Sequence, residues 1–175
     1  MSSGLRDLTV DVLRSAFGRF PSGVTAVAAM CDGRPEGLAA SSFTAVSIEP
    51  PLVSICVAHS SSTWPVLREA QCLGLSVLAE DHGPVARALA AKGIDRFADV
   101  EWEESAGGAV FVHGSALWLD CARFVAFPAG DHDIVVLSVR RVWTYPAVAP
   151  LVFHGSAFRA LRATDSDSDL CGRRS

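Results

Sequence analysis

The chain is poor in lysine and has no cluster of basic residues ahead of its tail. Lys92 is the only lysine in 175 residues, so arginine supplies nearly all of the positive charge, and the formal net charge is −4. Holding a polyanion by bulk electrostatics needs a basic surface. We therefore expect no nucleic-acid partner.

Paired cysteines and long apolar runs are missing as well. The cysteines are odd in number and none belongs to a Cys-x-x-Cys pair: Cys31, Cys56, Cys72, Cys121 and Cys171. Four of them lie in or beside apolar runs, which is typical of buried free thiols in a reducing compartment. The charged start of the chain does not resemble a signal peptide, and no uncharged apolar run reaches ~18 residues. We expect a cytoplasmic protein with no membrane partner.

Common catalytic motifs are also lacking. The chain contains no Gly-x-Ser-x-Gly, no His-Glu-x-x-His and no phosphate loop ending in Gly-Lys-Ser or Gly-Lys-Thr. The histidines are too scattered for a local metal site: His59, His82, His113, His132 and His154. We expect no metal, and no dedicated acid, base or nucleophile stands out.

Apolar segments of strand length are abundant. Strands are expected over residues 24–31, 52–57, 73–79, 109–113, 116–127, 134–139 and 150–158. Helices are expected over residues 9–20, with Thr9 as the cap, over 64–70 with Thr63 as the cap, and over 84–92 ending at Gly93. Long strands with few crossover helices predict a mainly β fold, an antiparallel barrel with peripheral helices. Residues 1–163 form one domain in this interpretation, and residues 164–175 a disordered tail.

Two stretches are rich in small and hydroxyl-bearing residues. Residues 37–51 let a ligand approach the backbone closely, and residues 59–63 add a second polar loop. A small-residue strand beneath bulky neighbours also explains the first stretch, and composition alone favours that explanation over ligand binding. Loops of this kind without catalytic side chains suit a protein whose ligand carries the chemistry. His132 follows Gly-Asp, and its local context favours a hairpin residue that points to solvent.

The motifs taken together resemble the short-chain flavin reductase family, the reductase components of two-component flavin-dependent monooxygenases. The resemblance spans about residues 13–161 and depends on motifs in a family-like order. They are Phe-Gly-Arg-Phe-Pro-Ser-Gly-Val-Thr at 17–25, the stretch 37–51, Ser-x-Thr at 61–63, Arg-Phe at 96–97, Gly-Asp-His at 130–132 and Pro-Leu-Val-Phe-His-Gly at 150–155. Each motif alone is weak, and their order makes the resemblance specific.

The resemblance implies an FMN-binding split barrel of antiparallel Greek-key type. It also implies an NAD(P)H:flavin oxidoreductase that transfers a hydride from NADH to FMN or FAD and supplies reduced flavin to a partner monooxygenase. A homodimer is expected. NADPH is the less favoured donor, because no arginine cluster marks a site for its 2′-phosphate.

The resemblance also assigns roles to residues of this chain. The flavin ring is expected against Gly37, Leu38, Ala39, Ala40, Ser41 and Ser42, beside Ser54, Ile55, Cys56 and Val57, with the turn Pro21, Ser22 and Gly23 close by. The ribityl and phosphate end is expected at His59, Ser60, Ser61, Ser62 and Thr63, with Arg96 and Phe97 closing over the flavin. Nicotinamide use is assigned to His132, also the expected catalytic residue, and to Phe153 and His154.

The chain departs from the family pattern at two places. Family members often have threonine at the position of Ala39, so one hydrogen bond to the flavin is expected to be missing. Many have an arginine in the phosphate loop, whereas residues 59–63 offer only His59 as a cation. A weaker hold on phosphate is the expected result, and it leaves the choice between FMN and FAD open.

Two other functions remain open from the sequence. One is a split-barrel oxidase or monooxygenase that retains its flavin and acts on an organic substrate. The other is a non-catalytic module that binds flavin. Both would bind the same ligand, so turnover of NADH separates them from a reductase.

Overall fold

The computed structural model describes residues 7–162, and the predicted tail lies outside them. Three helices and twelve strands occur in this range. The helices are α1 (Val10–Phe17), α2 (Trp64–Leu67) and α3 (Gly83–Ala90). The strands are β1 (Ser22–Gly23), β2 (Thr25–Cys31), β3 (Arg34–Ala40), β4 (Thr44–Ser47), β5 (Leu52–Ala58), β6 (Leu73–Val77), β7 (Trp102–Glu104), β8 (Val110–Val112), β9 (Leu117–Ala129), β10 (His132–Thr144), β11 (Val152–His154) and β12 (Ala157–Arg159).

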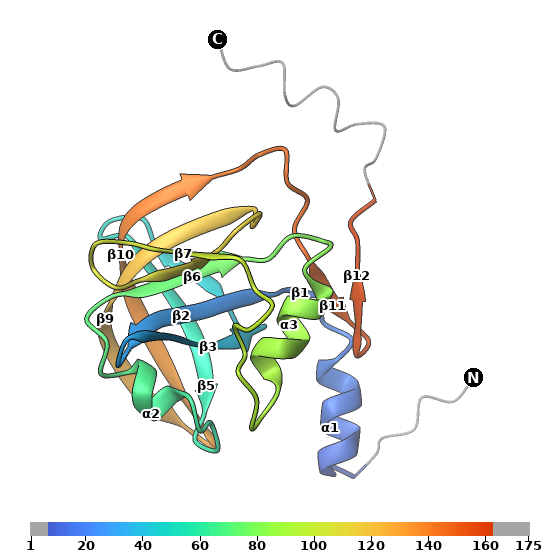
Figure 1. Cartoon of the computed structure of the whole chain (residues 1–175). Coiled ribbons are helices and arrows are strands. Elements are labelled where there is room, and N and C mark those ends of the chain that lie inside the picture. Colours follow the sequence, from blue (N-terminus) through green and yellow to red (C-terminus); the bar gives the residue numbers. More distant parts are fainter. Residues whose placement is uncertain (1–6, 163–175) are drawn as a thin grey trace.

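Seven of the strands form one antiparallel sheet that curls into the barrel (Figure 1). Their order is β3-β2-β6-β9-β10-β5-β4, and every pairing is antiparallel. Val27 of β2 and Ile55 of β5 share one buried core although three strands separate β2 from β5 in the order. That sharing requires the sheet to close on itself, and the predicted mainly β barrel with peripheral helices is confirmed.

A second core lies between the barrel and the elements packed outside it. Leu89 of α3, Val110 and Val112 of β8, and Leu151 are fully buried there against β2. In Figure 1, α3 lies beside β1 and β11. This packing holds the C-terminal end of α3 next to the end of β3, where the candidate site lies.

The predicted turns and caps are confirmed in part. Asp32 and Gly33 both have positive φ, which suits the tight turn between β2 and β3. Thr9 accepts a hydrogen bond from the Val12 N–H at 3.3 Å, as expected for the cap of α1. Helix α3 ends earlier than predicted: Ala91 is its C-cap in an extended conformation, so Gly93 lies beyond the helix.

Strand β10 begins earlier than the sequence predicts. Only Gly130 and Asp131 form the turn after β9, and His132 is already the first residue of β10. It pairs with Ala129 of β9 on one side and Ala58 of β5 on the other. Because the pairing fixes the direction of its side chain, His132 is held beside the end of β5 instead of pointing to solvent from a loose hairpin.

His82 makes the stability of the fold depend on pH. Its Nδ1 accepts a hydrogen bond from the Ala79 N–H at 3.2 Å, and its side chain is only 14% exposed. Burial lowers the pKa of His82 below its usual value of 6.5, although Asp81 opposes the shift. As the pH falls, the unfolded chain therefore protonates His82 before the folded chain does. The stability that neutral His82 contributes to the fold is complete above about pH 6.5 and is lost as the pH falls below it.

We expect the His82→Gln variant to lose less stability than the wild type between pH 8 and pH 5. Urea unfolding at the two pH values measures this, because every other residue is the same in both proteins and its effect cancels in the comparison. An equal loss in both proteins would show that His82 does not carry the effect.

Candidate functional site

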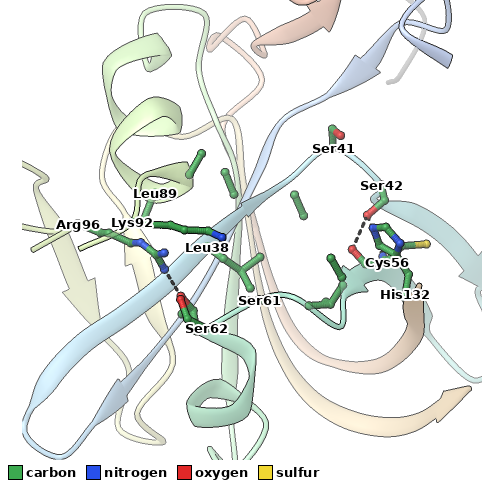
Figure 2. Close-up of a pocket in the computed structure, with 16 residues that line it drawn as sticks. Leu38, Ser41, Ser42, Cys56, Ser61, Ser62, Leu89, Lys92, Arg96 and His132 are labelled. Carbon is green, nitrogen blue, oxygen red and sulfur yellow. Dashed lines mark hydrogen bonds between the residues drawn. The ribbon is translucent and has the colours of Figure 1, made fainter. Parts of the chain in front are cut away.

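A cavity of about 360 Å³ opens where the ends of β3, β5 and α3 meet (Figure 2). Pockets for small molecules generally exceed ~300 Å³, so it can hold a cofactor-sized ligand in part. Among residues 7–162 it is lined by Leu38, Ala39, Ala40, Ser41, Ser42, Cys56, Val57, Ala58, Ser61, Ser62, Thr63, Leu89, Ala90, Lys92, Arg96 and His132. No acidic residue is in this set, so the cavity favours an anionic group.

One wall of the cavity consists of small residues at the end of β3. The stretch 38–42 contributes two alanines and two serines. The Ser42 hydroxyl accepts a hydrogen bond from the Cys56 N–H at 2.8 Å and donates one to the Cys56 carbonyl at 3.2 Å. These bonds hold the end of β3 against β5 and occupy the Ser42 side chain. A flat ring can therefore approach the backbone of this wall without meeting bulky side chains.

Cys56 departs from its expected environment. The sequence predicts a buried thiol, but Cys56 is exposed because alternate residues of β5 face opposite sides of the sheet. Ile55, its neighbour, is fully buried in the barrel core and does not line the cavity. Val57 is buried yet still contributes to the lining.

The hydroxyl loop 59–63 reaches the cavity through three of its residues. Ser61, Ser62 and Thr63 line it. Thr63 is the N-cap residue of α2 as predicted, but its side chain makes no capping bond. The Ser61 hydroxyl takes that role and accepts a hydrogen bond from the Trp64 N–H at 3.1 Å. Its proton remains able to point toward a ligand oxygen.

Two cations line the cavity beside these hydroxyls, and neither comes from the loop itself. Arg96 donates from Nε to the Ala91 carbonyl at 2.7 Å and from Nη1 to the Gly37 carbonyl at 2.8 Å, and Nη1 also contacts the Thr63 hydroxyl. Lys92 lines the same cavity. In Figure 2 these cations lie across the cavity from Ser42, Cys56 and His132. Arg96 was an expected site residue and lines the cavity, whereas His59, the one cation expected from the loop, does not.

His59 is directed away from the cavity. The Nε2 atom of its ring lies 2.9 Å from Asp133 Oδ1. Its backbone N–H donates a hydrogen bond to the Asp131 carbonyl at 2.9 Å. The carboxylate neighbour and the antiparallel pairing of β10 with β5 together explain this placement. Ser60 also lies outside the lining residues, so the loop contributes hydroxyls and no charge.

His132 lies at the end of the cavity opposite the cations. Its Nδ1 is 2.7 Å from Asp131 Oδ1, and this hydrogen bond lowers the pKa of Asp131. The contact engages one nitrogen of the ring and leaves Nε2 for another partner. His132 is thus positioned as a polar group beside the small-residue wall.

Several predicted site residues do not line the cavity. Gly37 accepts the Arg96 hydrogen bond, and a Cβ at this position would lie 3.0 Å from the ring of Phe97, which is itself buried. Ser54 lies within β5, paired with Val136 and Thr44. The turn Pro21, Ser22 and Gly23 lies at β1, which pairs with β11.

A second cavity of about 180 Å³ lies on the other side of the end of β3. Among the described residues it is lined by Val24, Ala39, Ala40, Ser41, Ala86, Ala90, Phe153 and Phe158. Phe153 therefore does not share a cavity with His132, although both are predicted to serve nicotinamide. His154 lies in β11 and lines neither cavity.

Sequence reasoning missed four lining residues: Ala58, Leu89, Ala90 and Lys92. Ala58 follows the predicted strand 52–57, and the other three lie within the predicted helix 84–92. The single lysine four residues before Arg96 is the one signal that could have been used.

No helix in residues 7–162 is long and apolar enough to cross a bilayer. Within the same range no group of three or more His, Cys, Asp or Glu side chains is arranged to hold a metal ion.

Comparisons with curated proteins find relatives over most of the chain. The actinorhodin polyketide dimerase of Streptomyces coelicolor is 38% identical over 86% of this chain and 85% of its own length. A flavin reductase of Pseudomonas putida is 34% identical over 86% of this chain and 89% of its own length.

A solved structure superimposes on nearly the whole chain. The NADH:FAD oxidoreductase SgcE6 of Streptomyces globisporus, in complex with NAD and FAD fragments, has a TM-score of 0.86 at 35% identity and covers 94% of this chain and all of its own. The family model described as the flavin reductase like domain matches residues 17–162. The chain belongs to this family of flavin reductase-like domains.

Proposed function

We propose that this protein is an NADH:flavin oxidoreductase that supplies reduced flavin to a partner monooxygenase. One observation carries the proposal: a single cavity has a wall of small residues at one end and hydroxyls with two cations at the other. That donor set suits a flat ring joined to a phosphate. Family membership and relatives such as the reductase subunit HsaB of a flavin-dependent monooxygenase, 34% identical over 78% of this chain, support it.

The residues of the first cavity fit a flavin. Ala39, Ala40 and Ser41 would take the ring, and Ser61, Ser62, Lys92 and Arg96 the phosphate end. A flavin held there would supply the hydride-accepting chemistry, with a reduced nicotinamide as the donor. The chain itself binds and aligns the two rings, a positioning effect worth several kcal/mol. His132 lies at the ring end and offers Nε2 as the polar group that orients the nicotinamide.

The direct test is oxidation of NADH by the purified protein with FMN or FAD added, followed by absorbance. We expect turnover that requires flavin and is faster with NADH than with NADPH. Turnover with each flavin then decides between FMN and FAD. Absence of flavin-dependent oxidation of either nicotinamide donor would disprove the proposal.

We expect the His132→Ala variant to raise the KM for NADH about tenfold, as the loss of one hydrogen bond of about 1.5 kcal/mol predicts. The dissociation constant of the flavin should change less than twofold, because the wall and the cations remain. Steady-state kinetics and flavin fluorescence titration measure the two quantities. His113→Ala, a half-exposed histidine outside the cavity, is the matched control. Collapse of flavin binding instead would contradict the assigned role.

A flavin-retaining enzyme acting on an organic substrate is the second candidate. It is favoured by the polyketide dimerase from Streptomyces coelicolor, whose name refers to another reaction. A protein that is purified yellow, keeps its flavin through gel filtration and reacts slowly with NADH would support it over a reductase that releases its product.

We also propose a homodimer. None of the residues of α1 is buried, and the helix projects from the barrel (Figure 1). Phe17 and Phe20 are 71% and 77% exposed, and Phe127 and Ile134, paired across β9 and β10, expose apolar surface beside the first cavity. Such surface is unusual for a monomer. A molar mass of twice 18.5 kDa, measured by light scattering, would support the dimer.

A further inference from the structure

The turn between β9 and β10, which leads into His132, is not held in place by packing. Residues 126–131 are all exposed within one protomer, and His132 and Asp133 are only partly buried. Pairing with β9 is also weakened there, because Asp133 lies opposite Pro128, which has no N–H to donate. The direction of the His132 ring therefore depends on hydrogen bonds from the neighbouring segment at the end of β5.

His59, the first residue after β5, contacts both neighbours of His132 in the chain. Its backbone N–H donates to the Asp131 carbonyl at 2.9 Å, and its ring Nε2 lies 2.9 Å from Asp133 Oδ1. The carboxylate of Asp131 in turn lies 2.7 Å from Nδ1 of His132. One residue thus holds the chain on either side of His132.

The ring of His59 does not act on the first cavity directly. Successive side chains of a strand point to opposite faces, so Asp133 points away from the face on which His132 lines the cavity. The His59 ring is bound to Asp133 and does not belong to the residues that line the cavity. Any effect of this ring on the reaction must therefore pass through the backbone that carries His132.

We propose that His59 is a positioning residue for His132 and not a ligand of the flavin phosphate. The inference rests on the proposed function, in which His132 orients the nicotinamide at the ring end of the cavity. Hydride transfer needs the two rings in alignment, and a small misplacement of a group that orients a substrate slows the reaction. The contact of His59 with Asp133 keeps the turn, and with it the His132 ring, where the nicotinamide binds.

The first test separates binding of NADH from binding of flavin. His59→Ala removes the ring contact but keeps the backbone N–H, so the KM for NADH should rise about threefold, as the loss of one partly exposed hydrogen bond predicts. The dissociation constant of the flavin should change by less than about 1.5-fold, since groups without shared contacts act independently. His59→Gln, which can still donate to Asp133, should recover most of the loss. Weaker flavin binding with an unchanged KM for NADH is the signature of a phosphate ligand and would overturn the proposal.

A double-mutant cycle shows whether His59 acts through His132. In the His132→Ala background, His59→Ala should have no further effect on the KM for NADH, because the group that it positions is gone. Asp133→Ala removes the same contact from its other end, so its effect should equal that of His59→Ala, and the two effects should not add. Additive effects of His59→Ala and His132→Ala would show that His59 acts by another route and would overturn the proposal.

Hydrogen exchange gives a measurement that does not depend on turnover. Backbone amides of residues 129–134 should exchange about threefold faster in His59→Ala and in Asp133→Ala than in the wild type. His113→Ala is the matched control and should exchange there at the wild-type rate, because His113 is 46% exposed, as His59 is 49% exposed, but lies near Glu103. Unchanged exchange in His59→Ala would overturn the proposal. A wild type that does not oxidise NADH would instead refute the proposed function, whereas the exchange rates would still show whether His59 holds the turn.

Discussion

Replacing Arg96 with methionine is expected to weaken flavin binding about 30-fold and to lower the free energy of unfolding by about 3 kcal/mol. The side chain joins three segments that are far apart in the chain. It donates to the Gly37 carbonyl of β3 and the Ala91 carbonyl after α3, and it contacts Thr63 before α2. Methionine fills a similar volume but leaves these oxygens without their donor. It also removes one positive charge from the proposed phosphate end.

The two effects of Arg96 can be separated with matched variants. Lys92 lines the same cavity from an exposed position. Because an exposed charge contributes little binding energy, Lys92→Met should weaken flavin binding about threefold and leave the free energy of unfolding unchanged. Arg96→Lys keeps the charge but cannot reproduce the forked geometry, so it should restore little. Flavin fluorescence titration and urea unfolding measure the two quantities. Unchanged flavin affinity in Arg96→Met would leave Arg96 a purely structural role.

Gly74→Ala is expected to lower the free energy of unfolding by about 3 kcal/mol or more, as overpacking a filled core does. Gly74 lies in β6, and β8 crosses directly over it. A Cβ there would overlap the Val110 carbonyl oxygen and lie 2.7 Å from its carbon. These are backbone atoms, so relief requires β8 to move. That movement would strain the buried hydrogen bond from the Val112 N–H to the Ser76 hydroxyl, which is 3.0 Å long.

Gly23→Ala is the matched control for stability. A Cβ at Gly23 has no atom within 4 Å, and its φ is not positive, so the change should alter the free energy of unfolding by less than about 0.5 kcal/mol. Urea unfolding of both variants measures the difference. A Gly74→Ala variant as stable as Gly23→Ala would show that β8 is not held against β6 in solution.

The sequence predicts the barrel because its signals are local. Alternating or continuous apolar runs with turn residues between them identify the strands, and the Asp32–Gly33 turn joins β2 and β3 as predicted. The stretches 38–42 and 61–63 stand out by their small and hydroxyl-bearing residues, and the structure brings both to one cavity. The order of the motifs also identifies the family, because these local motifs follow one another along the chain in a family-like order.

The composition of the site could not be predicted in the same way. A loop without arginine predicts a weak hold on phosphate, yet α3 ends beside that loop and places Lys92 and Arg96 in the same cavity. His59 was the cation expected from the loop, and the pairing of β10 with β5 places it against Asp133 instead. Neither contact is local: Arg96 and Gly37 are 59 positions apart, and His59 and Asp133 are 74 apart.

By itself the sequence determined that this chain is a small mainly β protein with a small-residue wall and a hydroxyl loop, because residue size, polarity and periodicity act over a few neighbours. Tertiary structure alone decided that Lys92 lines the cavity and His59 does not, and that Phe153 and His132 lie in different cavities. The physical reason is strand register and helix packing. A side chain's direction follows from its own strand, but its neighbours across space follow from how distant segments pair.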